Sequence, residues 1–259
     1  MYKQNYTTSI LIYLKIFLLN SIFYSFIMTQ NISNKGTLIL NCLVNNDAPP
    51  NRSFVDNSIE YFPTLSIKKD LNDKSLIDAE WSYQIKRSYS GDSLYNNLSN
   101  NHRLWIRYVN DKIETRIGLQ KIVFGPTKLL RSLSWFDSLD PKDPSQITTG
   151  VKSIRLKYFL SNNIVLWSWL VDNSSNLSYG ARSEILFKIG ELGLTLHKDP
   201  NNIAQSITPI EIPINSSHSR FAIDYRYDGF IGFWNESVLI KFNDKNITEN
   251  ITLISLGAD

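Results

Sequence analysis

The chain has 259 residues and a formal net charge of +3, and one large all-β domain can account for a chain of this length. So small a net charge argues against the polybasic surface with which proteins bind nucleic acid. The single cysteine, Cys42, excludes a disulfide framework and a cysteine metal site.

Residues 1–29 differ in composition from the rest of the chain. Lys3 precedes an apolar run at 9–28, which Lys15 interrupts. This pattern predicts an export signal, cleaved just before Gln30, followed by one domain at 30–259. A retained membrane anchor is the alternative, because the run approaches the roughly 20 residues that span a bilayer. The central Lys15 favours the signal.

The segment 76–86 is the clearest strand in the remaining chain. Ile77, Ala79 and Trp81 alternate with Asp78 and Glu80, so one face is apolar and the other polar. In a soluble sandwich the apolar face would point inward, whereas in a membrane barrel it would point toward lipid. Alternation alone does not separate these two folds.

Similar patterns predict about twelve strands in all. They lie at 36–44, 58–69, 76–86, 103–109, 112–125, 151–160, 163–171, 181–189, 191–197, 220–228, 230–242 and 251–259. The segments 163–171 and 230–242 are apolar on both faces, which favours a packed soluble core. Pro63 lacks an N–H group for the strand ladder and predicts a bulge within 58–69, or a register of this strand that differs locally from the alternation.

The connections between these segments alternate in length. Short turns are expected at 71–75, 108–113, 160–164, 188–192 and 227–230, and long loops at 90–101, 126–150, 172–179, 198–219 and 243–250. Short turns on one side and long loops on the other are typical of a transmembrane barrel. The sequence therefore predicts an all-β, antiparallel, up-and-down transmembrane β-barrel.

Several motifs carry a resemblance to a known group of proteins. The matching residues are Arg116, Gly118, Gln120, Gly125, Leu130, Arg131, Trp135, Phe136, Asp137, the run 140–144, Thr149, Gly150, Gly180, Arg182, Gly190, Glu191, His197, Asp224, Gly232, Trp234 and Glu236. Together they resemble strand and loop patterns of porin-like outer-membrane β-barrels, a broad group that includes alginate-export porins. The resemblance implies a porin or transporter in the outer membrane of a Gram-negative bacterium.

The C-terminal sequence departs from that pattern. Such barrels commonly end on an aromatic residue, whereas this chain ends at ISLGAD. We therefore expect an incomplete barrel whose last strands are missing. The alternative is closure between the last segment and residues 38–44, which would avoid an open sheet edge in lipid.

Charged residues on the polar strand faces are the candidate lining of a pore. The candidates for the lining and its constriction are Arg103, Arg107, Glu114, Arg116, Arg131, Asp137, Arg155, Lys157, Arg182, Glu184, Asp224 and Arg226. Basic residues outnumber acidic ones in this set, which favours anionic solutes. Neutralisation between neighbouring strands is the alternative role. The loop at 125–150 can fold inward and bring Arg131 and Asp137 to the constriction.

Metal and cofactor chemistry has little support in the sequence. Asp137, Asp140 and Asp143 form a weak candidate cation site, although aspartate beside proline more often initiates turns. His102, His197 and His218 show no metal-ligand spacing. The nucleophile, zinc-protease, phosphate-loop and dinucleotide motifs are absent, so we expect neither an enzyme nor a cofactor.

These observations leave three hypotheses for the function. The first is an outer-membrane channel for small hydrophilic solutes, with membrane lipid as its surroundings and no nucleic-acid partner. The second is a barrel that binds polysaccharide or another surface partner. The third is an exported soluble β-sandwich that binds a ligand.

Overall fold

The computed structural model describes residues 31–44, 53–127, 131–136, 147–148, 150–173, 176–200, 217–242 and 250–258. The expected signal at 1–29 lies outside the described residues. The strands are β1 (Asn31–Val44), β2 (Val55–Asn72), β3 (Ser75–Ser90), β4 (Ser93–Val109), β5 (Ile113–Gln120), β6 (Val151–Ser161), β7 (Ile164–Asp172), β8 (Leu177–Phe187), β9 (Gly190–Asp199), β10 (His218–Tyr227), β11 (Phe233–Phe242) and β12 (Ile251–Ala258). Among these residues, no helix is long and apolar enough to cross a bilayer.

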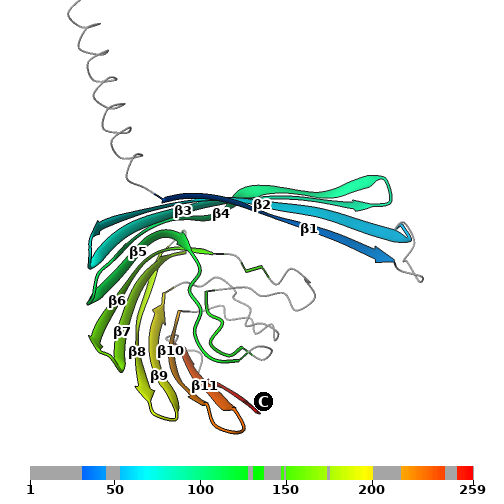
Figure 1. Cartoon of the computed structure of the whole chain (residues 1–259). Helices are drawn as coiled ribbons and strands as arrows, with labels where there is room; N and C mark the ends of the chain where they lie inside the picture. Colours follow the sequence, from blue (N-terminus) through cyan, green and yellow to red (C-terminus); the bar gives the residue numbers. More distant parts are fainter. Residues whose placement is uncertain are drawn as a thin grey trace, which may run out of the picture.

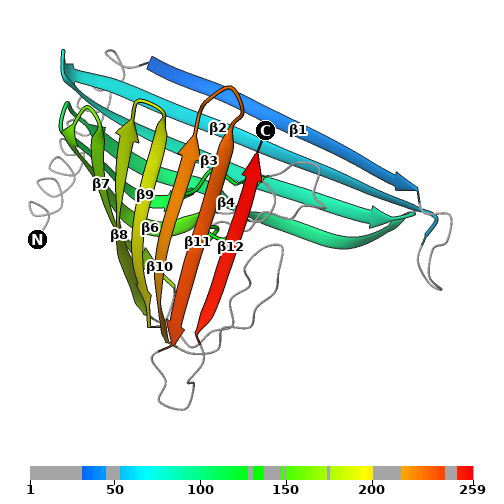
Figure 2. The ribbon, with the colours of Figure 1, turned by 90° about the horizontal axis from the view of Figure 1, so that it is seen from below.

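All these strands belong to one 12-stranded antiparallel sheet, in which each strand pairs with the next in sequence. This arrangement confirms the all-β, up-and-down fold and the expected strand number. It also makes the two-sheet sandwich wrong for the described residues. Strands β1–β4 form a broad wing, and β5–β12 curl into a trough (Figures 1 and 2). β1 and β12 are the outer edges, so closure through 38–44 is not observed in the described part.

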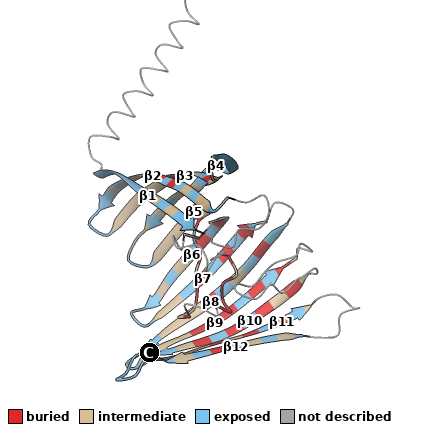
Figure 3. Cartoon of the chain, turned by 90° about the vertical axis from the view of Figure 1, so that its right-hand side faces the viewer, coloured by how far each residue is buried: buried red, intermediate tan, exposed pale blue. Residues whose placement is uncertain are grey.

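On β6, β9 and β10 the concave face of the trough is polar and the convex face is apolar. On β6, Ser153 and Arg155 are buried on the concave face, whereas Ile154 and Leu156 are exposed on the convex face. β9 and β10 repeat the pattern: Thr195, His197, Arg220 and Asp224 are buried, and Leu194, Leu196, Phe221 and Ile223 are exposed (Figure 3). Burial thus runs opposite to hydrophobicity, which is the reverse of a soluble half-buried sheet.

The strands that are apolar on both faces have a local explanation. Trp167, Trp169 and Val171 of β7 and Val238 and Ile240 of β11 point into the trough. There they join a buried cluster with residues of the connection between β5 and β6, namely Ile122, Phe124, Leu133 and Phe136. Their inner faces are apolar because a chain segment packs on them.

That segment also corrects the expected strand at 112–125, because β5 ends at Gln120. Residues 121–127 leave the sheet and enter the trough, and 131–136 pack beside them (Figure 1). We call these described residues the strap. Ile122 and Phe124 extend the alternation past Gln120 on the face that carries Glu114 and Arg116, and they bury their side chains in the trough.

The long loop expected at 90–101 is wrong. β3 and β4 are joined by a tight turn at Gly91 and Asp92, and Ser93 is already paired with Ser90. Asn and Ser are poor strand formers in general, but here β3 supplies a complete backbone partner for them. Most other connections keep the expected alternation: short at 73–74, 110–112, 162–163 and 188–189, and long at 121–150, 200–217 and 243–250. The connections at 173–176 and 228–232 do not, because the one expected to be long has four residues and the one expected to be short has five.

The bulge expected at Pro63 is also wrong. Tyr61 lies opposite Ile85 and Thr64 lies opposite Ser82, so the register between β2 and β3 is the same on both sides of the proline. The ladder has no paired residue for Phe62 and Pro63 on the β3 side. The missing N–H group is therefore accommodated by two unpaired positions and not by an inserted residue.

Candidate functional site

The concave face of the sheet carries the charged residues that the sequence singles out. Directly opposite residues on neighbouring strands share a face. These opposite pairs can be followed from strand to strand, from Asp78–Arg107 on β3 and β4 to Gly193–Asp224 on β9 and β10. The residues that they place on the concave face are Arg103, Arg107, Glu114, Arg116, Arg155, Lys157, Arg182, Glu184, Asp224 and Arg226. Arg131 is buried within the strap. Asp137 lies outside the described residues, as do Asp140 and Asp143.

A first group, the cationic cluster, is formed by Arg107, Glu114, Arg116, Arg155 and Lys157 on β4, β5 and β6. Glu114 lies at its centre: Arg155 Nη2 donates to Oε1 at 2.5 Å, and guanidinium nitrogens of Arg107 and Arg116 lie 3.7 and 3.8 Å from the carboxylate. One carboxylate thus serves three arginines. The neutralisation is incomplete even with Asp78 included.

Asp78 of β3 extends the cationic cluster toward the wing. Arg107 donates to its two carboxylate oxygens from Nε at 2.9 Å and from Nη2 at 2.6 Å. Planar, two-pronged pairing of this kind fixes the orientation of a guanidinium group. Arg107 is therefore held in place, whereas Arg116 and Arg155 each keep a buried Nε without a hydrogen-bond partner among the described residues.

Two tryptophans flank the cationic cluster. The Arg116 guanidinium lies 4.2 Å from the ring centre of Trp105, and Lys157 Nζ lies 3.7 Å from that of Trp167. A cation over an indole face is stabilised by the ring quadrupole. Sequence reasoning did not assign Trp105 or Trp167 to the site, although each lies directly opposite a residue on the inner face.

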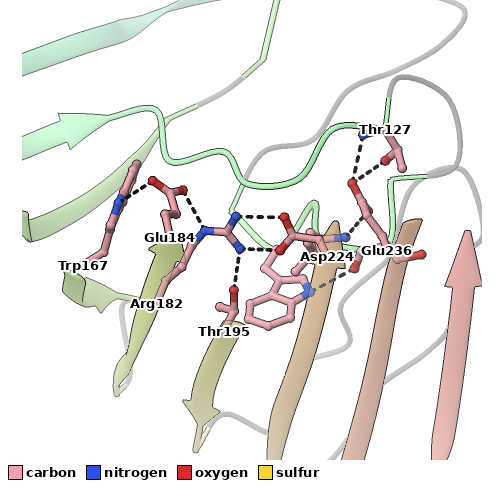
Figure 4. Close-up of polar contacts among 10 residues, drawn as sticks. Thr127, Trp167, Arg182, Glu184, Thr195, Asp224 and Glu236 are labelled. Atoms are coloured by element: carbon pink, nitrogen blue, oxygen red, sulfur yellow. Dashed lines mark hydrogen bonds and ion pairs between the residues drawn. The ribbon is translucent and has the colours of Figure 1, made fainter. Parts of the chain in front are cut away.

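A second group surrounds Arg182 on β8. Arg182 Nη1 and Nη2 donate to the Asp224 carboxylate at 2.6 and 2.9 Å, Nε donates to Glu184 at 2.8 Å, and Nη1 also donates to Thr195 Oγ1 at 2.7 Å (Figure 4). Trp167 Nε1 donates to the other oxygen of Glu184 at 2.9 Å. Arg182 is thus neutralised locally, as the alternative role predicts.

Gly193 permits this contact. It lies on β9 between Glu184 of β8 and Asp224 of β10, and a β-carbon there would overlap both Arg182 and Asp224. The ion pair passes over the middle strand at the one place without a side chain. The resemblance pointed to Arg182 and Gly190, but Gly193 was missed because its role appears only in the register.

Gly180 has the same role one strand pair away. It lies between Trp169 of β7 and His197 of β9, and Trp169 Nε1 donates to His197 Nδ1 across it at 3.2 Å. His197 also contacts the rings of Trp135 and Phe136 from the strap. His197 is therefore a structural contact of the strap. No group of three or more candidate metal ligands occurs within the described ranges.

The strap is fastened by Glu236 of β11. One carboxylate oxygen accepts hydrogen bonds from Thr127 N at 3.0 Å and Thr127 Oγ1 at 2.7 Å, and the other accepts one from Leu133 N at 3.1 Å (Figure 4). Ser132 and Ser255 are joined by a further hydrogen bond at 2.8 Å. Glu236 is 1% exposed. Every hydrogen bond that the structure defines for this buried carboxylate is donated by the strap.

Comparisons with known proteins give little for this chain. No protein-family model matches the sequence, and no curated protein matches it. One similar solved structure is described as the Salmonella typhi OmpF complex with daunomycin, with a TM-score of 0.41 and 9% sequence identity over 88% of this chain and 85% of that chain. What this chain does is therefore inferred from its own residues.

Proposed function

We propose that this protein is a porin-like channel of the outer membrane, exported by a signal at 1–29, for small hydrophilic solutes with a preference for anions. The observation that carries the proposal is the inside-out distribution of side chains, with apolar residues exposed on the convex face and charges buried on the concave face. In a bilayer this convex face would be stable, because its apolar side chains would lie in hydrocarbon and not in water.

The path of the solute runs along the cationic cluster. The trough between β7 and β11 is occupied by the strap and its apolar contacts. The inner faces of β3–β6 carry instead the partly exposed Arg107, Arg116 and Lys157, which is the polar surface that a hydrated solute needs. Arginine and lysine in excess over carboxylates favour anions.

A second candidate is a plugged barrel that binds a partner at its surface. The strap favours this alternative, because its apolar side chains pack with those of β7 and β11 and fill the space that a solute would need. The two candidates differ in one measurable property, since a plugged barrel conducts no ions.

The test uses the full chain in lipid, where a pore requires β1 and β12 to close the sheet. We expect heat-modifiable migration on gels and discrete conductance steps in planar bilayers. In a salt gradient, the sign of the reversal potential should show that anions permeate better than cations. A chain that stays folded and monodisperse without detergent would contradict the membrane proposal. A lipid-embedded chain without conductance would select the plugged barrel.

Opposite faces of β3 are expected to differ in tolerance of charge. Ala79 lies on the convex face between Ile67 and Ile106, so Ala79→Arg should lower the free energy of unfolding in vesicles by about 2–4 kcal/mol. Gln84 lies on the concave face and donates to Glu60, so Gln84→Arg should be mild. A urea titration of each variant measures both values, and equal losses would contradict a lipid-facing strand.

The cationic cluster is expected to set the ion preference. Replacing Arg116 and Lys157 by glutamate should lower the anion-to-cation permeability ratio several-fold, because both cations are partly exposed on the concave face. Lys152→Glu makes the same charge reversal at one residue, on the exposed convex face, and should leave the ratio unchanged. Reversal potentials measure the ratio, and equal shifts in both variants would place the determinant elsewhere.

A further inference from the structure

We propose that the cationic cluster is a binding site for one dianionic, tetrahedral oxyanion, the group that inorganic sulfate and phosphate esters have in common. This inference rests on the proposed function, because it names the class of anion that the same surface selects. Binding and conductance are measured separately, so the site can fail while the channel stands.

Three arginines lie side by side in one row of the concave face. Arg107 of β4 is directly opposite Arg116 of β5, which is directly opposite Arg155 of β6. Like charges in directly opposite positions destabilise a sheet. The neighbours in the same row are Asp78 on β3 and the uncharged Trp169 on β7. The row thus has one carboxylate for three cations, and a bound anion would relieve the repulsion.

The charges of the cluster favour a dianion over a monoanion. The next row adds one carboxylate and one cation, since Glu114 lies directly opposite Lys157. Four cations thus face two carboxylates, which leaves an excess of two positive charges. Farther along β3 and β4, Glu80 and Arg103 add one charge of each sign and leave this excess unchanged. A single ion of charge −2 would balance it.

Two of the arginines have donors to spare. The Arg116 guanidinium donates no hydrogen bond to any described residue and lies 4.2 Å from the ring centre of Trp105. Arg155 is 6% exposed, donates from Nη2 to Glu114, and keeps an Nε without a partner within the described ranges. Forked guanidinium donors match the oxygens of a phosphate-like group. The side chains of Arg107 and Arg116 are 26% and 18% exposed, so an anion in the trough can reach the row.

Titration calorimetry of the full chain in detergent micelles tests the site. We expect one sulfate to bind per chain, and acetate, which carries one charge, to bind about tenfold or more weakly. Methyl phosphate at about pH 8 serves as the second probe, because the second pKa of a phosphate ester is about 6. Binding of both probes identifies an ester group as the ligand, and binding of sulfate alone identifies the free ion.

Two lysines of β6 provide a matched pair of variants. Lys157→Gln removes a cation of the cluster that donates no hydrogen bond to a described residue, and it should weaken sulfate binding about tenfold. Lys152→Gln makes the same change on the convex face and should leave the affinity unchanged. Glu114→Gln removes the central carboxylate and should tighten sulfate binding, a gain that damage to the fold would not produce.

Three results would overturn the proposal. They are sulfate binding no tighter than acetate binding, equal affinities in Lys157→Gln and the parent chain, and weaker sulfate binding in a folded Glu114→Gln variant. Conductance without sulfate binding would also overturn the site, although the channel would stand. Sulfate binding without conductance would support the site within a plugged barrel.

Discussion

Replacing Asp224 by alanine is expected to lower the free energy of unfolding by about 3–5 kcal/mol, because it leaves the buried Arg182 without its two-pronged partner. Arg182 is 4% exposed and donates to both oxygens of Asp224, while Glu184 accepts only from Nε. The remaining carboxylate does not replace two charge-assisted hydrogen bonds. A urea titration in lipid vesicles measures the loss.

Two further variants separate the ion pair from general damage. In the double variant Arg182→Met with Asp224→Leu, both charges are removed together, so most of the lost stability should return. Asp228→Ala breaks the ion pair with Arg226, in which the Asp228 side chain is 59% exposed and the Arg226 side chain 58%. This variant should change the free energy of unfolding by about 0–1 kcal/mol. If the double variant is as unstable as Asp224→Ala, the loss comes from packing and not from an unpaired charge.

The strand faces were predictable from the sequence because alternation is a local property. Arg155 and Lys157 alternate with Ile154 and Leu156, and the structure keeps those two pairs on opposite faces. The same reasoning gave the expected strand number. Which face is buried follows from the fold as a whole, because alternation has no direction until the curvature of the sheet is known.

The contacts between strands were not predictable, because they depend on register. Gly193 lies on β9, and its role is to let Arg182 of β8 reach Asp224 of β10 across that strand. Nothing in the sequence next to Gly193 indicates this contact. The strap was expected only as a loop that folds inward. Its apolar residues Ile122 and Phe124 continue a strand pattern, so the sequence alone extends β5 where the chain in fact turns into the trough.

The departure of the chain from the sheet after β5 has two structural consequences. Because β5 ends at Gln120, the strap is available to fill the trough and the far half of β4 loses its neighbour. One chain segment therefore determines both the occupied half of the trough and how much of β4 pairs with β5. Substitutions that release the strap should therefore change conductance.

Glu236 is the residue at which the strap can be released. Glu236→Ala removes the acceptor of Thr127 N and Leu133 N, and each buried N–H group left without a partner costs about 1–3 kcal/mol. We expect the strap to leave the trough, the single-channel conductance to rise and trypsin to cleave after Arg131, which is buried in the intact protein. Conductance recordings and limited proteolysis measure the two effects separately.

A graded series on β11 tests whether Glu236 acts through the strap. Glu236→Gln keeps one acceptor oxygen and should give an intermediate conductance, and Ser237→Ala, on the neighbouring position that faces the other way, should change neither readout. Cleavage after Arg131 with unchanged conductance would mean that the strap is released but does not narrow the path. That result would leave the cationic cluster as the candidate constriction, because its arginines are held by Glu114 and Asp78 on the sheet itself and do not depend on the strap.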